Sequence, residues 1–218
     1  MVSDSHPPLL AVRDLRIDRG GQCLIAGLSF ELRRGAMLVL RGPNGSGKTS
    51  LLRALAGIGP VHSGKVEANG VAQDAEPSQY GANIAYWGHR DGLKEGQRAI
   101  DALRQWQGLS GATLSTSDAA ALLVRVGLGE RATFPIRTFS AGQRRRVGLA
   151  RLLARQASIW LMDEPFTALD SAGKSLLGEA MAEHRRAGGG VIAALHDAFD
   201  GEGIETLTLG VAQDEAAA

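Results

Sequence analysis

The fold of this chain is decided by a glycine-rich stretch, which reads Gly42-Pro43-Asn44-Gly45-Ser46-Gly47-Lys48-Thr49. Its spacing fits the Gly-x4-Gly-Lys-Ser/Thr pattern of a phosphate-binding loop. Residues 37–40 before it form a short apolar run that predicts a buried strand, and residues 50–56 after it have helical character. The stretch therefore predicts a strand–loop–helix unit, with a glycine-rich turn and a solvated lysine as the alternative.

The residue types of this stretch suit a nucleotide's phosphates. Glycines let successive backbone N–H groups converge on phosphate oxygens, and the positive end of the following helix points at the same charge. We expect Lys48 to reach the β and γ phosphates and Thr49 to hold Mg²⁺. All eight residues of the loop, together with Ser50, are therefore predicted to bind the nucleotide.

A second apolar run ends in two carboxylates. Residues 159–162 predict a buried strand, and Asp163 and Glu164 follow it directly. Open α/β sheets bind ligands at the carboxyl edge of their strands, so beyond a phosphate loop this pair is the expected other half of the site. We expect Asp163 to anchor Mg²⁺ through water, and Glu164 to orient and polarise the water that attacks the γ-phosphate. Taken alone, the pair is equally typical of a solvated strand end.

The rest of the chain alternates predicted strands and helices. Strands are predicted at 9–17, 28–32, 66–68, 84–87 and 191–195, and helices at 99–106, 118–126, 143–155 and 171–186. The first two strands read as an antiparallel pair, and the later alternation implies an α/β fold with a mostly parallel sheet and helices on both faces. Ser117 is expected to cap helix 118–126 and Gly127 to end it.

Length and composition narrow the organisation further. The chain has 218 residues, a formal net charge of +1 and a single cysteine, Cys23. We therefore expect one domain over residues 1–218, no intramolecular disulfide and no nucleic-acid partner. No stretch approaches the roughly 18 to 20 apolar residues that cross a bilayer, so we expect no direct membrane insertion. Residues 88–157 are mainly helical and lie between two predicted sheet strands, which predicts an inserted helical subdomain.

A further motif, Ser140-Ala141-Gly142-Gln143, enters the helix predicted at 143–155. Residues 139–146 and the phosphate loop together resemble the ABC transporter ATPase family, whose signature is usually Leu-Ser-Gly-Gly-Gln. Phe139 and Ala141 depart from that signature. The resemblance runs from residue 9 to about residue 209. It implies a P-loop NTPase core with an N-terminal antiparallel β region and an inserted helical subdomain, and hydrolysis of ATP with Mg²⁺.

The resemblance also assigns roles by position. Asp170 looks like the residue that contacts the opposite subunit, and His196 looks like the switch histidine that senses the γ-phosphate. The start of a helix with Ser and Gly is an anion site, yet the phosphate loop of the same chain already has its phosphate. The signature is therefore expected to face the nucleotide of a second copy, in a head-to-tail dimer with two ATP molecules at its interface.

A narrower resemblance rests on Gly88-His89-Arg90-Asp91-Gly92-Leu93-Lys94. With Ser-Ala-Gly-Gln and Asp-Glu-Pro-Phe-Thr-Ala-Leu-Asp at 163–170, this pattern is similar to the haem-exporter ATPase subunits of the bacterial cytochrome c maturation (Ccm) system. That similarity implies a peripheral protein on the cytoplasmic face of the inner membrane, coupled to the Ccm permease subunits. ATP then drives either haem transport or release of a haem-loaded chaperone. The alternatives are another small-substrate exporter, or a non-transport ABC ATPase.

Two further positions depart from the family pattern. The region after the first strand usually supplies an aromatic residue that stacks on adenine, but the first aromatic here is Phe30. We expect Arg19 to replace it by guanidinium stacking. The position of the loop glutamine is taken by Arg90, or by His89 with a one-residue slip, and we expect both to contact the permease. Either alignment leaves Mg²⁺ with one carbonyl ligand fewer from that loop.

Overall fold

The structure is a computed structural model that describes residues 7–109, 111–195 and 201–210. The described chain divides into two compact units. The first takes in the described residues up to 86, residues 157–164 and the described residues from 184 onward; the second comprises residues 87–156 and 165–183.

The first unit contains a five-stranded sheet in the order β6-β7-β8-β3-β9. Its strands are β3 (Met37–Arg41), β6 (Ile84–Trp87), β7 (Ile159–Asp163), β8 (Gly190–Ala194) and β9 (Ile204–Thr208). β3 pairs in parallel with β8 and β9, and β7 in parallel with β8. All residues of β7 and β8 are buried, as expected for parallel strands covered on both faces. The predicted α/β fold with a mostly parallel sheet is confirmed.

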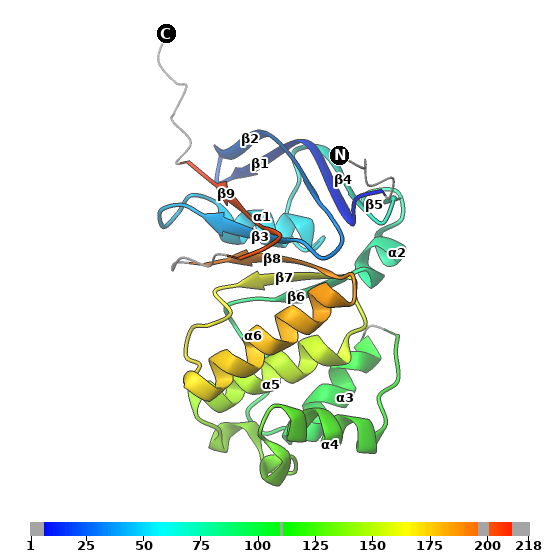
Figure 1. Cartoon of the computed structure of the whole chain (residues 1–218), viewed down its shortest axis with the longest axis vertical. Helices are drawn as coiled ribbons and strands as arrows, with labels where there is room; N and C mark the ends of the chain where they lie inside the picture. Colours follow the sequence, from blue (N-terminus) through cyan, green and yellow to red (C-terminus); the bar gives the residue numbers. More distant parts are fainter. Residues whose placement is uncertain (1–6, 110, 196–200, 211–218) are drawn as a thin grey trace. The chain divides into compact units, whose positions relative to one another are not determined.

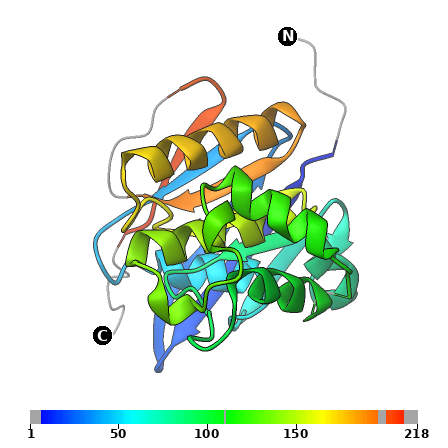
Figure 2. The same cartoon turned by 90° about the horizontal axis from the view of Figure 1, so that it is seen from below.

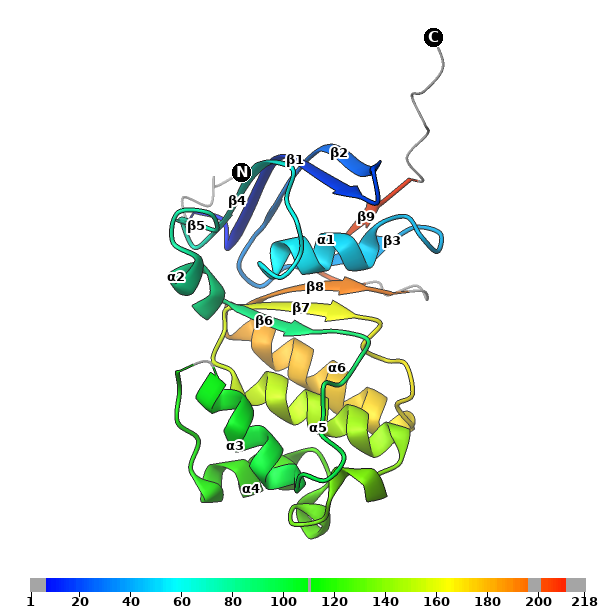
Figure 3. The same cartoon turned by 180° about the vertical axis from the view of Figure 1, so that it is seen from behind.

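The same unit carries an antiparallel sheet in the order β2-β1-β4-β5. Its strands are β1 (Leu10–Arg19), β2 (Gln22–Leu32), β4 (Ser63–Ala68) and β5 (Val71–Ala72). Helix α1 (Lys48–Leu55) lies between this sheet and the parallel one, as Figures 1 and 3 show, and contacts β1, β7 and β8. Leu51, Leu52 and Leu55 on this helix are fully buried. The core of the unit therefore closes around the helix that follows the phosphate loop.

Three elements of this unit are absent from the sequence prediction, namely β5, α2 (Pro77–Ala82) and β9. β5 and α2 are two and six residues long, so both are too short for a hydrophobic period to repeat. β9 is an edge strand with exposed and half-buried residues only, and its sequence lacks the apolar run of the central strands. Pairing with β3, which is far away in the sequence, is what makes it a strand.

The second unit is built from helices. They are α3 (Ala99–Leu109), α4 (Thr116–Arg125), α5 (Ala141–Ala154) and α6 (Ser171–Arg186), whose last residues belong to the first unit, with short 3₁₀ turns at Gly129–Arg131 and Ile136–Thr138. α3, α4 and α5 contact one another and lie side by side in green to yellow-green in Figure 2. Leu103, Leu123 and Val147 form part of the buried interior. None of the described helices is long and apolar enough to cross a membrane.

The start of α4 differs from the prediction. Ser115, not Ser117, caps the helix, because the Ser115 hydroxyl accepts a hydrogen bond from the backbone N–H of Asp118 at 3.0 Å. The first turn of α4 is polar and exposed, so the apolar pattern begins after the helix does. The predicted end is confirmed, since Gly127 has a φ of 73° and its N–H donates to the carbonyl of Val124 at 2.9 Å.

Candidate functional site

The phosphate loop leaves β3 at Gly42 and enters α1 at Gly47. Gly47 has a left-handed φ of 96°, which a residue with a side chain adopts only at a cost. A Cβ on Gly42 would lie 2.4 Å from the carbonyl oxygen of Leu209 and 2.6 Å from Oγ of Ser46. The path of the loop therefore requires glycine at both positions.

The side chain of Lys48 reaches back to the first residues of this loop. Its ammonium donates to the carbonyl oxygens of Gly42 at 2.7 Å and Pro43 at 2.9 Å, and its side chain is buried. An ammonium has three donors, so these two bonds leave one for a phosphate oxygen. Thr49 is exposed in the first turn of α1 and Ser50 is half-buried. Gly47 has no side chain to cap the helix, so the first-turn N–H groups suit an external anion.

The acidic pair lies at the same edge of the sheet as the phosphate loop. Asp163, the last residue of β7, is 3% exposed and pairs with Ala194 of β8. On its other side, Ala194 pairs with Leu40 of β3, two residues before the loop. Parallel strands end at a common edge, so Asp163 and the loop flank the end of β8. The structure thus brings the two predicted halves of the nucleotide site together.

Glu164 has an unusual backbone conformation. Its φ is 49°, in the left-handed region, and its N–H donates to the carbonyl of Ala194 at 3.2 Å. Such a conformation in a non-glycine residue costs about 1–3 kcal/mol and occurs preferentially at functional sites. The backbone therefore departs from strand geometry at Glu164, directly after the last residue of β7.

The hairpin that carries Arg19 runs beside the phosphate loop. Arg19 pairs with Gln22 across the β1–β2 turn, and both are exposed. In the next stretch of β2, Ile25 lies 3.4 Å from the position that a Cβ on Gly47 would take. Phe30 is farther along β2, towards its other end. His196 lies outside the described residues; the described stretch before it ends at Leu195, one residue after β8.

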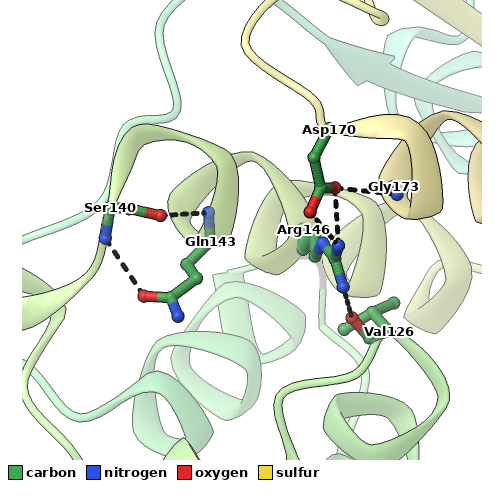
Figure 4. A network of polar contacts seen from close by, with 6 residues as sticks. All are labelled: Val126, Ser140, Gln143, Arg146, Asp170 and Gly173. Atoms are coloured by element: carbon green, nitrogen blue, oxygen red, sulfur yellow. Dashed lines mark hydrogen bonds and ion pairs between the residues drawn. The ribbon is translucent and has the colours of Figure 1, made fainter.

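In the second unit, Ser140 and Gln143 cap the N-terminus of α5 (Figure 4). The Ser140 hydroxyl accepts from the Gln143 N–H at 3.2 Å, and the Gln143 side-chain oxygen accepts from the Ser140 N–H at 3.1 Å. This reciprocal pair is a capping box, and it defines where the helix begins. Ser140 and Ala141 are exposed and Gly142 is half-buried. The predicted signature is therefore an ordered helix start that carries a small, exposed polar edge.

Asp170 binds within its own chain. Its carboxylate accepts from the Arg146 guanidinium at 2.6 and 2.8 Å and from the Gly173 N–H at 2.9 Å, so that it also caps α6 (Figure 4). The Arg146 hydrogen bond and then the Gly173 N–H hold the pKa of Asp170 below its ordinary value. Sequence reasoning missed Arg146 as the partner of Asp170, because nothing in the run 144–146 tells which arginine faces another helix.

The segment 88–94 presents its predicted contact residues to solvent. His89 and Arg90 are both exposed, and they lie in an irregular stretch between β6 and α3. The flanking residues Gly88 and Asp91 are half-buried. Both predicted contact side chains are thus accessible on one short stretch.

With this geometry in place, comparison with known proteins identifies the family. The sequence profile of the ABC transporter family matches residues 25–167, which include the phosphate loop, Ser140–Gln143 and the acidic pair. The chain belongs to the ABC transporter family. As a member of it, this ABC ATPase is the ATP-binding and ATP-hydrolysing subunit of an ABC-type transporter.

Relatives cover nearly the whole chain. The chain is 43% identical over 201 residues to the "Cytochrome c biogenesis ATP-binding export protein CcmA" of Paramagnetospirillum magneticum, covering 91% of this chain and 93% of that protein. It is also 43% identical to the protein of the same name from Paracoccus denitrificans, covering 93% and 89%. The solved ATP-binding subunit of an ABC transporter superimposes with a TM-score of 0.75 at 27% identity, covering 85% of this chain and 79% of that one.

Replacing Arg146 by Gln tests what holds the Asp170 carboxylate. We expect its pKa to rise towards the ordinary 3.8 while staying somewhat below it, because the Gly173 N–H still donates. A carboxyl group whose pKa is lower in the folded state than in the unfolded state stabilises the fold above the unfolded-state pKa. That stabilisation is lost as the pH falls through the folded-state pKa. Carboxyl-carbon NMR titration measures the shift, and Arg125→Gln, which breaks an exposed ion pair with Glu183, is the control. An unmoved Asp170 titration in Arg146→Gln would contradict this account.

Proposed function

We propose that this ABC ATPase energises the membrane permease of a cytochrome c biogenesis complex, for haem export or for release of a haem-loaded chaperone. The observation that carries the proposal is the shared name of relatives that are 43% identical over nearly the whole chain. The segment 88–94 and the Ser-Ala-Gly-Gln signature support it. ATPase subunits of other small-substrate exporters remain the second candidate, because the phosphate loop and acidic pair serve them equally.

We infer the roles of the nucleotide-site residues from their places at the sheet edge. The phosphate loop, residues 42–50, binds the phosphates of ATP through backbone N–H groups and Lys48. At that edge, Glu164 orients the attacking water and accepts its proton. By the family resemblance alone, His196 senses the γ-phosphate. A hydroxyl and a carboxylate are oxygen donors that suit Mg²⁺, so Thr49 and Asp163 would hold it there. The ion, when bound, neutralises charge on the β and γ phosphate oxygens.

We infer that Arg19 contacts the adenine base. The contact of Ile25 with the start of α1 places the β1–β2 hairpin beside the phosphate loop. Arg19 is exposed near its turn, and a guanidinium offers a planar face for stacking on an aromatic ring.

We further propose that the chain works as a head-to-tail dimer with two ATP molecules at the interface. The signature residues Ser140, Ala141, Gly142 and Gln143, of which the first two are exposed and the last two half-buried, would bind the nucleotide of the partner copy, and Asp170 would contact that copy. Residues 88–157 would form a helical subdomain within the single ATPase domain of residues 1–218.

His89 and Arg90 would contact the Ccm permease subunits on the cytoplasmic face of the inner membrane, where the chain is peripheral.

Glu164→Gln tests the assignment of the general base. We expect hydrolysis in the assembled complex to fall about 10²–10⁴-fold, because the amide keeps the shape but cannot accept a proton. ATP binding should persist and dimers should accumulate with ATP. The measurements are phosphate release, nucleotide affinity and mass by light scattering. Glu205→Gln, which changes an exposed glutamate of the same unit, should leave turnover unchanged. Near-normal turnover in Glu164→Gln removes Glu164 from this role.

Mixed dimers test whether the signature acts on the partner's nucleotide. Chains with Ser140→Arg and chains with Lys48→Ala should each fail to form ATP-driven dimers alone, through bulk at the signature and loss of phosphate binding. A mixture should recover one intact site per dimer, since one site escapes both lesions. Nucleotide trapping with two differently tagged chains measures the recovery, and a mixture of two tagged Ser140→Arg chains is the control. Absence of trapping in the mixed dimer argues against the trans arrangement.

Replacing His89 and Arg90 together by Ala tests the permease contact. Both side chains are exposed, so nucleotide binding by the isolated subunit should stay normal. Co-purification with the permease and the level of holo-cytochrome c should fall, since the loop would lose its charged groups for the partner. Replacing the exposed pair Arg125 and Glu183 by Ala, elsewhere in the same unit, is the control. Normal co-purification and normal holo-cytochrome levels would contradict the proposed contact.

A further inference from the structure

One face of the signature helix α5 holds the start of the segment 88–94. Arg145 is 4% exposed, and its guanidinium lies 4.4 Å from the centre of the Trp87 ring. The same group donates to the carbonyl oxygen of Gly88 at 2.8 Å and reaches a carboxylate oxygen of Asp91 at 3.4 Å. Burying a guanidinium without hydrogen-bond partners is costly. Here the backbone of Gly88 and the side chain of Asp91 provide these partners for Arg145, and the Trp87 ring contacts it.

Two turns farther along α5, Arg151 holds the same segment at a second point. It donates to the backbone carbonyl of Asp91, and its guanidinium stacks 3.4 Å from the centre of the Trp106 ring. Burial lowers the pKa of Arg151 to about 10, and Asp91 opposes this, so the group stays protonated at neutral pH. A cavity of about 180 Å³, lined in part by Leu93, Lys94 and Trp106, borders this contact.

Between the two arginines, α5 packs directly on Trp87. A Cβ on Gly148 would lie 2.6 Å from the Trp87 ring nitrogen, so the close approach requires a residue without a side chain. Arg145, Gly148 and Arg151 are spaced three residues apart and so share one face of the helix. This face of α5 therefore packs against residues 87–91 from Arg145 to Arg151.

We propose that Arg145 and Arg151 are positioning residues that fasten the segment 88–91 to the signature helix, so that the two move as one body. The carbonyls of Gly88 and Asp91 are bound by the helix, whereas the two residues between them, His89 and Arg90, are exposed. The backbone is thus anchored on both sides of the residues that face solvent. A displacement of α5, whose N-cap is Ser140, is passed to His89 and Arg90 without passing through a flexible link.

The inference rests on the proposed permease contact of His89 and Arg90, and it adds how that contact is held. Lysine at position 145 keeps the positive charge but loses the planar face over Trp87 and the forked donors. The test is therefore Arg145→Lys in the full chain and in the complex purified from its native membrane. Gly148→Ala is a second variant, because its added methyl group should disturb the close contact with Trp87. Alanine favours a helix more than glycine does, so any loosening of the segment would not be due to a weaker helix. Arg125→Lys, in an exposed ion pair of the same unit, is the matched control.

Two readouts separate positioning from general stability. In Arg145→Lys, the rate of amide hydrogen exchange in residues 88–94 should rise about tenfold, because the free energy lost with one charged hydrogen bond corresponds to about that factor. The amides of α3 and α4 should keep their protection. Permease-stimulated ATP turnover should fall about tenfold, whereas the KM for ATP of the isolated subunit should change by less than about twofold. Arg125→Lys should change none of these. Should Arg145→Lys not fold, Arg151→Lys applies the same test at the second anchor.

The outcomes distinguish this inference from the proposed function. Unchanged exchange in residues 88–94, or exchange that rises equally throughout the unit, overturns the positioning role. A loosened segment with full permease stimulation overturns the transmission of movement through it. If the His89 and Arg90 double variant keeps its permease while Arg145→Lys loosens the segment and lowers stimulation, positioning stands and the proposed contact residues are wrong. If only the double variant loses the permease, the contact stands and the positioning role is overturned.

Discussion

The nucleotide site depends on helix α1 being held between two sheets. Leu51, Leu52 and Leu55 are fully buried, so the axis of this helix is set by core packing against β1, β7 and β8. Because the helix cannot tilt without opening that core, its N-terminus stays directed at the phosphate loop. Lys48 binds the loop carbonyls of Gly42 and Pro43, and Gly42 and Gly47 have positive φ angles where the loop leaves the strand and enters the helix. Burial of a few leucines thus sets the direction of the backbone N–H groups that we propose bind phosphate.

Strand β8 has a comparable role for the acidic residues. It lies between β3 and β7, and Ala194 pairs with Leu40 on one side and Asp163 on the other. The carbonyl of Ala194 also accepts from the N–H of Glu164, which stabilises the left-handed turn there. One small, buried strand end therefore sets the spacing between the phosphate loop, Asp163 and Glu164. The left-handed backbone conformation of Glu164 is strained, and it is held by this hydrogen bond and by the buried strand β7 that precedes it.

The arginine run at 144–146 shows how a helix gives neighbouring side chains different functions. Successive residues on an α-helix point about 100° apart. Arg145 is therefore buried against Trp87 and Gly88, while Arg146 pairs with Asp170 at the start of α6. Two adjacent, chemically identical residues thus connect the signature helix to two different segments. Exposed pairs contribute little to stability, but the buried guanidinium of Arg145 leaves unpaired polar groups when it is lost.

The sequence by itself determined the fold class and the family, and it placed the candidate site residues in contiguous motifs. The glycine pattern at 42–49, the apolar run that ends in Asp163 and Glu164, and the signature at 140–143 are contiguous, so the α/β fold and the ABC family were predictable from them. Short-range hydrogen-bonding patterns are encoded by neighbours, which is why the end of α4 at Gly127 was also predictable. The start of that helix was missed because its capping turn is polar and carries no apolar period.

Only the tertiary structure decided which distant residues meet. The pairing of β9 with β3, the contact of Arg146 with Asp170, and the attachment of residues 88–91 to α5 join segments that are 24 or more residues apart. No local pattern distinguishes Arg145 from Arg144 or Arg146, since all three have the same side chain on the same helix. The face that each arginine presents, and what is packed there, depends on how the helix is set against its neighbours. That setting is fixed by burial summed over the whole unit, which no single stretch of sequence contains.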